Sequence, residues 1–135
     1  NTQTSWQTIL YKGGNTPAQY NNAFKFSISS QLYNFGVYLG SGNGGQTSPA
    51  YSNKLKWHHY VFAKQGNVLK MFKDGVLLWD LPNPYCNLLD ANGFNLMLGK
   101  SSFPGNGLPF NGRLDEFRIY NRVLTSSEVQ KLYKL

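Results

Sequence analysis

The chain has 135 residues, which is enough for one domain that buries a core of its own. It has no apolar run long enough to span a membrane, and its polar first residues show no signal peptide. Its net charge of +7 is scattered rather than gathered in a block, which argues against nucleic acid as a partner. The single cysteine, Cys86, excludes an internal disulfide and a cysteine-rich metal site.

The composition is typical of an all-β protein. The 14 glycines suit turns, and the 9 tyrosines and 9 phenylalanines suit strands. Apolar runs bounded by turn residues predict strands in this order: 5–12, 24–29, 32–40, 57–64, 68–80, 94–100 and 110–121. A polar, glycine-rich loop is expected at 41–53, and a proline-rich connection at 81–93.

The stretch VLKMFKDGVLLWD, residues 68–80, is the clearest local signal. Two apolar runs flank Asp74-Gly75, a dipeptide that tolerates positive φ and therefore suits a tight hairpin turn. The preceding WHHYVFAK (57–64) is apolar on both faces, which indicates a strand covered on both sides. Trp57 and Val61 are therefore expected in the core.

A short helix is predicted at the end of the chain. Thr125 is placed to cap it, and Glu128 follows three residues later, which is the pattern of a capping box. Val129, Leu132 and Tyr133 then share one face, so the helix is expected to cover an edge of the core.

The last predicted strand, 110–121, carries two of the six acidic residues side by side. Alternation places Asp115 on the same face as Phe117 and Ile119, which are expected in the core, while Glu116 points the other way. A buried carboxylate must be paired, hydrogen-bonded or bound to a metal. Asp115 is thus either a salt-bridged or amide-bound side chain, or a ligand for a hard cation such as calcium.

Two motifs resemble a known family. WHHYVFAKQGNVLKMFKDGVLLWD (57–80) is similar to a hairpin of the laminin G-like, concanavalin A-like jelly rolls. FNGRLDEFRIYNRVLTSSEVQKLY (110–133) is similar to their closing segment. The resemblance extends from about residue 5 to 134. It implies a single laminin G-like domain over 1–135, an antiparallel two-sheet sandwich with a short C-terminal helix.

The resemblance also implies a structural calcium in several relatives. There the aspartate at the position of Asp115 holds the ion, and Gly13 or Gly14 would supply backbone ligands here by analogy. The family usually opens with further strands before the segment that is 6–13 in this chain. The hypothesis is that these strands, which would pair with 113–120, come from upstream sequence or from another subunit by strand addition.

Catalysis is not expected. Retaining glycosidases need two carboxyl groups roughly 5 Å apart. Asp115 and Glu116 point to opposite faces, and so do His58 and His59, which argues against a shared metal. The resemblance makes His59 a hydrogen-bonded strand histidine.

Two functions stay open, with polyanion binding as a third that is supported by charge alone. The first is a non-catalytic glycan-binding or adhesion module of a surface or secreted protein, with a glycan or surface polysaccharide as partner. Its ligand candidates are Tyr38 with Asn34, and Tyr51 in the 41–53 loop. The alternative is a structural module that binds other protein subunits of an assembly, such as a virion decoration, a fibre head or a surface array.

Overall fold

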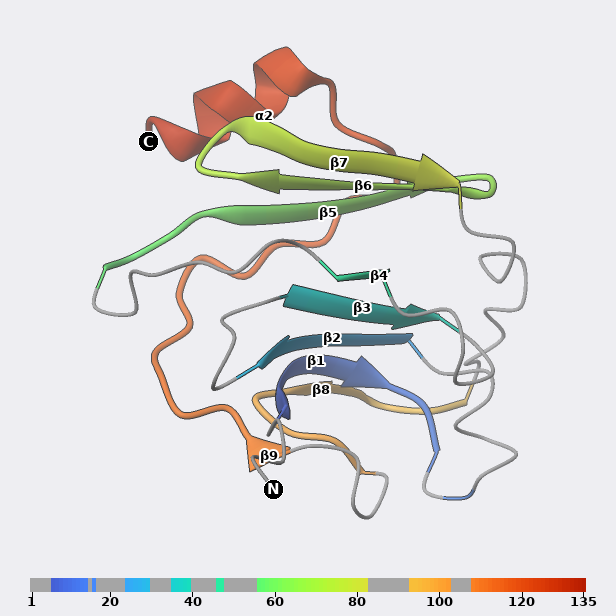
Figure 1. Cartoon of the computed structure of the whole chain (residues 1–135). Coiled ribbons are helices and arrows are strands. Elements are labelled where there is room, and N and C mark those ends of the chain that lie inside the picture. The colour runs from blue at the N-terminus through green and yellow to red at the C-terminus, as the bar shows by residue number, and fades with distance from the viewer. Residues whose placement is uncertain are drawn as a thin grey trace. The chain divides into compact units, whose positions relative to one another are not determined.

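The computed structural model describes residues 6–14, 16, 24–29, 35–39, 46–47, 56–82, 93–102 and 108–135. The chain divides into two compact units. Unit 1 comprises residues 1–54 and 88–112, and unit 2 comprises 55–87 and 113–135. Each unit contains one β-sheet, and a short helix ends the chain (Figure 1). The predicted all-β class with two antiparallel sheets is confirmed, while the single domain over 1–135 stays a prediction.

The sheet of unit 1 has the strand order β4-β3-β2-β1-β8, and β9 pairs with β1 in parallel. The strands are β1 (Trp6–Lys12), β2 (Phe24–Ser29), β3 (Phe35–Leu39), β4 (Gln46–Thr47), β8 (Leu96–Leu98) and β9 (Leu108–Pro109). The register pairs Thr8 with Ser27 and Tyr11 with Lys25. β4 lies within residues 41–53, which were predicted to form a loop. The sequence did not predict this strand, because a strand of two residues is too short to leave an alternation pattern.

The sheet of unit 2 has the order β5-β6-β7, with all pairs antiparallel. β5 covers Tyr60–Gln65, β6 covers Val68–Lys73 and β7 covers Val76–Pro82. The predicted hairpin is confirmed, since Asp74 (φ 51°) and Gly75 (φ 79°) form its turn. Positive φ at both central residues suits a primed turn, whose twist matches that of the flanking strands.

Helix α2 (Ser126–Tyr133) packs on one face of this sheet (Figure 1). The contact is made by Phe72 of β6 with Leu124 and Val129, and Val61 and Leu132 lie against them. The predicted packing of Val61 is therefore confirmed. None of the described helices is long and apolar enough to cross a membrane.

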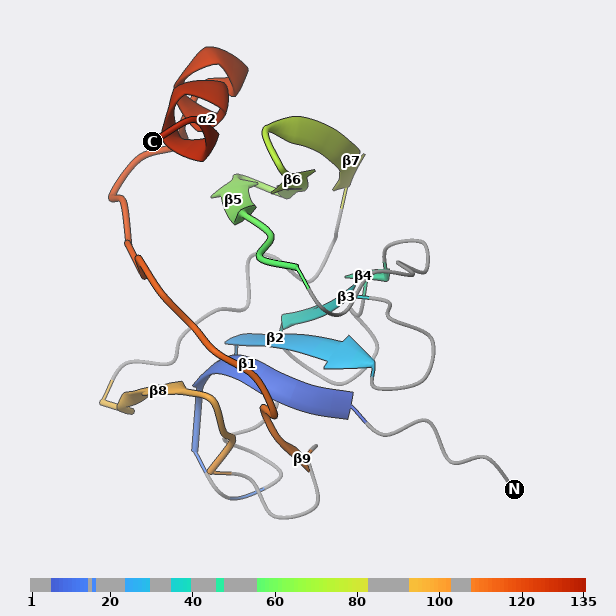
Figure 2. The ribbon, with the colours of Figure 1, turned by 90° about the vertical axis from the view of Figure 1, so that its left-hand side faces the viewer.

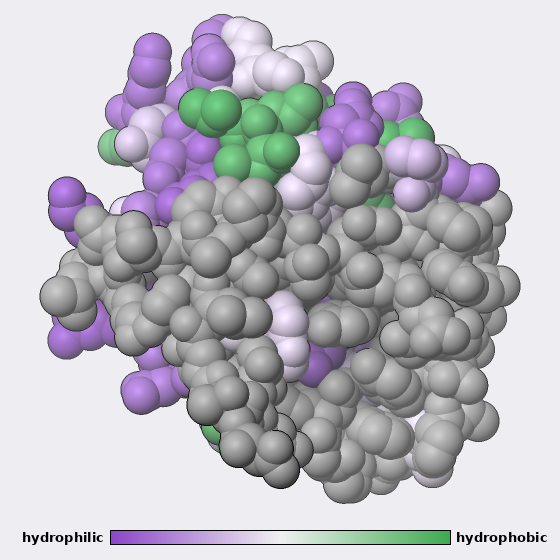
Figure 3. Space-filling view, viewed as in Figure 1, coloured by the Kyte–Doolittle hydropathy of each residue, from purple (hydrophilic) through white to green (hydrophobic). Residues whose placement is uncertain are grey.

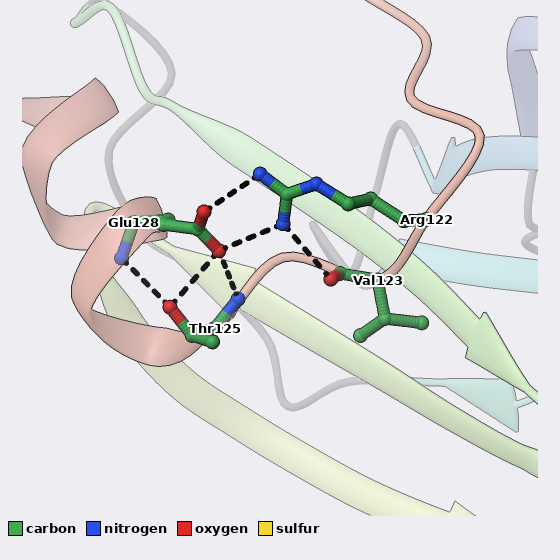
Figure 4. A network of polar contacts seen from close by, with 4 residues as sticks. All are labelled: Arg122, Val123, Thr125 and Glu128. Carbon is green, nitrogen blue, oxygen red and sulfur yellow. Dashed lines mark hydrogen bonds and ion pairs between the residues drawn. The ribbon is translucent and has the colours of Figure 1, made fainter.

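The predicted capping box at the start of α2 is also confirmed. Thr125 Oγ1 accepts a hydrogen bond from the Glu128 amide, and the Glu128 carboxylate accepts one from the Thr125 amide (Figure 4). The Arg122 guanidinium holds the same carboxylate by two bonds of 2.7 and 3.0 Å (Figure 4). These contacts lower the pKa of Glu128 to about 2, with the bond from Arg122 as the largest cause.

Three residues expected in the core are exposed. Trp57 is 64 % exposed, Phe117 46 % and Ile119 70 %. The predicted closing strand 110–121 is wrong, because no described residue beyond β9 joins a sheet. Residues 113–121 run as a coil between β9 and α2 (Figure 2). Alternation predicts which side chains share a face, but it does not supply the strand that would cover them.

Hydrophobic side chains are also exposed on unit 2, where a hydrophobic patch has hydrophilic residues beside it (Figure 3). Val76 and Leu77 of β7 are among the exposed apolar residues of unit 2. Exposed apolar residues are common singly, and a contiguous group is more informative about binding.

We expect Thr125→Ala to lower the free energy of unfolding by about 1 kcal/mol, because the variant loses the side-chain acceptor of the helix cap. Urea denaturation at neutral pH measures this. Ser127 lies two residues after Thr125, in the first turn of α2, and is exposed. Ser127→Ala is therefore the matched control and should leave stability nearly unchanged. Equal stability of the two variants would contradict a capping role for Thr125.

Candidate functional site

The Asp74 carboxylate joins the hairpin turn to the segment that precedes β5. Asp74 Oδ2 lies 2.8 Å from Nδ1 of His58, and Oδ1 accepts a hydrogen bond of 2.9 Å from the His59 amide. The Asp74 amide donates to the His59 carbonyl at 2.8 Å. We call these contacts among His58, His59 and Asp74 the Asp74 clamp. It holds both the backbone and one side chain of residues 58–59.

The local sequence explains why the clamp forms. β5 and β6 pair antiparallel with Tyr60 opposite Lys73, so the next positions outward place His59 opposite Asp74. A turn aspartate with positive φ can direct its short side chain back to neighbouring backbone amides. Sequence reasoning missed this site. The signal was the register of the predicted strand 57–64 against the predicted hairpin 68–80, which places His59 opposite Asp74.

The two histidines have different surroundings. The His58 ring, bonded to Asp74, also lies edge-on to Tyr60 at 6.2 Å. The His59 ring stacks on Tyr133 of α2 at 6.2 Å, and its Nδ1 is buried with no hydrogen-bond partner among the described residues. The expectation of a hydrogen-bonded His59 ring is therefore wrong for Nδ1, because the clamp bonds the His59 backbone instead.

Burial lowers the pKa of His59, opposed by the Asp74 charge and assisted by the Arg118 charge. A neutral imidazole is favoured where a charged one would lose its hydration. His59 is thus a packing residue between the clamp and α2. Among the described residues, no group of three or more His, Cys, Asp or Glu side chains could hold a metal ion.

Trp57 directly precedes the clamp and presents its indole to solvent. Its exposed fraction of 64 % is large for a residue that usually buries most of its surface. The neighbouring Lys56 is exposed as well. We call Lys56, Trp57 and the Asp74 clamp the Trp57 site. It combines a flat apolar ring, an N–H donor and a cation next to a segment whose backbone is fixed.

The proposed calcium ligands lie in different units. Asp115, expected to be buried, is exposed, and its Oδ1 accepts the Glu116 amide at 2.8 Å. Asp115 is exposed because residues 113–121 lie outside any sheet. Gly13 and Gly14 are buried in unit 1, where their carbonyls accept bonds from Ser102 Oγ at 3.1 Å and from the Tyr11 hydroxyl at 2.7 Å. Each of these groups has a partner of its own, and calcium binding stays a prediction.

The predicted glycan ligands are only partly covered by the structure. Tyr38 lies in β3, paired with Lys25 of β2. Asn34 and Tyr51 lie outside the described residues.

The sheet of unit 1 has a buried polar face made by Thr8, Lys25, Ser27 and Ser29. Lys25 is 3 % exposed and the other three are fully buried. The Ser27 hydroxyl has no hydrogen-bond partner in the described part of the chain. Burial lowers the pKa of Lys25 to about 8. The burial of Lys25 bears on the stability of the fold.

The acidic side chains also bear on catalysis. Three of the five described ones form ion pairs, namely Asp80 with Lys70 (3.1 Å), Glu116 with Arg118 (2.6 Å) and Glu128 with Arg122 (2.7 Å), and Asp74 lies 2.8 Å from the His58 ring nitrogen. The fifth, Asp115, accepts the Glu116 amide through Oδ1 at 2.8 Å.

Comparison with known proteins places these features in context. The profile of the concanavalin A-like lectin/glucanases superfamily matches residues 1–130. A comparison with curated protein sequences found no match.

Solved structures give similar folds. CBM40 of a Ruminococcus gnavus IT-sialidase is 22 % identical, with a TM-score of 0.76 over 98 % of this chain and 77 % of that one. The same module bound to α2,3-sialyllactose is 22 % identical over the same shares, with a TM-score of 0.77. A leech intramolecular trans-sialidase complexed with 2,7-anhydro-Neu5Ac is 19 % identical, with a TM-score of 0.76 over 97 % of this chain and 21 % of that one. Together with the matching profile, these structures confirm the predicted two-sheet jelly-roll fold.

We expect the stability of the protein to rise between pH 8 and pH 10.5. The unfolded chain keeps the Lys25 proton up to its ordinary pKa of 10.5, whereas the folded chain loses it near pH 8. The penalty of a buried charge is therefore full below pH 8 and is relieved above it. The rise should be roughly 1–3 kcal/mol, since one pKa unit corresponds to about 1.4 kcal/mol. Chemical denaturation at several pH values measures it, and Lys25→Met should remove it. If stability rises equally with pH in the Lys25→Met variant, the rise does not come from Lys25.

We expect protonation of His59 to destabilise the fold. Its pKa is lower in the folded chain than the ordinary 6.5, so the unfolded chain binds the proton first as pH falls. Stability should thus drop as pH falls below 6.5, until the folded-state pKa is passed. Thermal unfolding of the protein and of His59→Gln between pH 7.5 and pH 5 checks this, with about 6.5 as the onset. His58→Gln is the control, because His59 still titrates in it.

Proposed function

Because the chain belongs to the concanavalin A-like lectin/glucanases superfamily, we propose that it is a non-catalytic carbohydrate-binding module and that the Trp57 site holds the sugar. The ligand class we propose is an acidic glycan that ends in sialic acid. The module would act at a cell surface or in a secreted protein, with a glycan or surface polysaccharide as partner.

The observation that carries the proposal is the exposed indole of Trp57 on a fixed segment. A pyranose ring has a flat face of C–H groups, which packs well on an aromatic ring. A tryptophan supplies a large rigid contact area at a low cost in conformational entropy. The Asp74 clamp holds the next two residues through both carboxylate oxygens. A ring presented in this way loses less freedom on binding than one on a mobile loop.

The proposed acidity of the ligand rests on charge and on a structural neighbour. The chain carries 13 basic against 6 acidic residues, and Lys56 is exposed beside Trp57. An exposed ammonium favours a carboxylate ligand, with a strength that falls as salt is added. One similar structure, at 22 % identity, is a sialidase module bound to α2,3-sialyllactose. Sialyllactose carries a carboxylate where lactose has none.

The absence of catalysis is part of the proposal. Three of the five described acidic side chains form ion pairs with Lys or Arg, and Asp74 is bonded to the His58 ring. A calcium ion held by Asp115 with Gly13 or Gly14 remains part of the proposal as a structural ion, not as a contact to sugar.

We expect Trp57→Ala to weaken binding of 3′-sialyllactose at least tenfold, a loss of about 1.4 kcal/mol or more in contact with the ring. Titration calorimetry or ligand-observed NMR measures the affinity. Val76→Ala removes another exposed apolar side chain of unit 2 and is the matched control, with unchanged affinity expected. Equal affinity of the Trp57 variant and the control would place the sugar elsewhere.

Further measurements define the ligand. Lys56→Gln should reduce the preference for sialyllactose over lactose severalfold and weaken its salt dependence. Binding that persists in EDTA leaves calcium at most a structural role. No binding of either sugar, with or without calcium, would favour the second candidate function, an assembly module. One observation favours that candidate, namely the exposed segment 113–121.

A further inference from the structure

The segment between β9 and α2 has the chemistry of a strand without a partner. Its residues Arg113 to Asn121 are all exposed, including the apolar Leu114, Phe117, Ile119 and Tyr120. Figure 2 shows it as one continuous coil that ends at α2. Such residues are typical of strands, where they pack against cross-strand neighbours.

The backbone of this segment is also unpaired within the described chain. No hydrogen bond from the described residues outside 113–121 reaches its amides or carbonyls. Within it, the Glu116 amide bonds to Asp115 Oδ1. Unpaired amides and carbonyls along a stretch of strand-forming residues are a template for pairing with another strand. The unit therefore exposes both the polar and the apolar groups that a partner strand would cover.

Read in the opposite direction, the segment is complementary to itself at residues 114, 116–118 and 120, whereas Asp115 faces Ile119. In an antiparallel pair of two copies centred on Phe117, residue 116 of one copy faces 118 of the other. Glu116 then faces Arg118 of the second copy, and Arg118 faces its Glu116. Leu114 faces Tyr120 on the same side, and the two Phe117 rings face each other on the opposite side. Opposite charges and aromatic or apolar side chains directly across a strand pair are stabilising.

From this self-complementarity we propose that two copies of the chain form a symmetric dimer by antiparallel pairing of residues 113–121. The interface is isologous, because each copy contributes the same segment. Two ion pairs form across it for each dimer, both between Glu116 and Arg118. In the single chain the same two side chains already form an ion pair at 2.6 Å within one segment. Dimerisation exchanges the two pairs of two single chains, one in each, for two between chains, without leaving a charge unpaired.

One backbone feature opposes the paired form in the single chain. Glu116 has φ 51°, a left-handed conformation that is unfavourable for a residue with a side chain and does not continue a strand. Pairing requires Glu116 to become extended. The dimer thus forms with a small rearrangement, and we expect a weak, reversible association, as befits a two-stranded contact smaller than a standard interface.

Sedimentation velocity of the full chain tests the proposal over concentrations up to about 1 mM, the range for weak complexes. A reversible monomer–dimer equilibrium is expected. Glu116→Arg places two arginines opposite each other, and Arg118→Glu places two glutamates opposite each other. Each variant alone should raise the dissociation constant about tenfold, because two attractive pairs become repulsive. Circular dichroism verifies that each variant is folded.

The decisive measurement mixes the two single variants. Glu116→Arg and Arg118→Glu together place opposite charges at both cross-strand positions of a heterodimer, although the ion pair within each chain stays broken. Dimer should therefore reappear in the mixture with an affinity within about threefold of the natural chain. If the Glu116–Arg118 pair only stabilises the single chain, no dimer should reappear in the mixture. A chain that stays monomeric at all concentrations, or a mixture without dimer, overturns the proposal.

A cross-link that leaves the charges unaltered provides an independent test. Only the central residue faces its own copy, so Phe117→Cys in a Cys86→Ser background should form a disulfide dimer under mild oxidation. Directly opposed strand residues have Cα separations of about 4.5–5.5 Å, within the range of a disulfide. Ser127→Cys in the same background is the control and should remain monomeric. Equal cross-linking of the two variants contradicts the register centred on Phe117.

Discussion

The arrangement of unit 2 depends on one carboxylate. Asp74 stands at the turn of the β6–β7 hairpin with positive φ, and from there it bonds the His58 ring and the His59 amide. This connects the turn to the segment before β5, and His59 connects that segment to α2 through Tyr133. Gly75 follows in the turn with φ 79°, and it is this positive φ that favours glycine there, since a side-chain carbon would be in ordinary contact with the Tyr133 ring at 3.4 Å. Trp57 directly precedes the residues that these contacts hold.

The two units differ in what they bury and what they expose, and the difference bears on stability in unit 1 and on binding in unit 2. Unit 1 buries Lys25 with its neighbouring hydroxyls, at an electrostatic cost that only stability measurements detect. Unit 2 exposes Trp57 and the apolar residues of 113–121, at a cost in hydrophobic free energy. Exposed apolar groups next to fixed backbone are typical of surfaces that bind, and this contrast is why both proposals concern unit 2.

Local patterns predicted the local structure well. The hairpin turn and the helix cap each depend on a few adjacent residues, and both form as expected around Asp74 and Thr125. The candidate site was harder to predict. Trp57 was expected in the core because its neighbours are apolar on both faces, and Asp115 because it alternates with Phe117 and Ile119. Both interpretations assumed that another element covers the strand, which periodicity does not encode.

By itself, the sequence determined the all-β class, the resemblance to the concanavalin A-like family and the positions of the turn and the cap, because alternation, turn residues and capping are local. The tertiary structure decided that Asp74 holds the segment before β5, that Lys25 is buried and that Trp57 and residues 113–121 face solvent. Exposure depends on which distant segments pack together. The side chains at 57 and 113–121 have the same chemistry whether they are covered or open, so only the fold distinguishes a core residue from a binding surface.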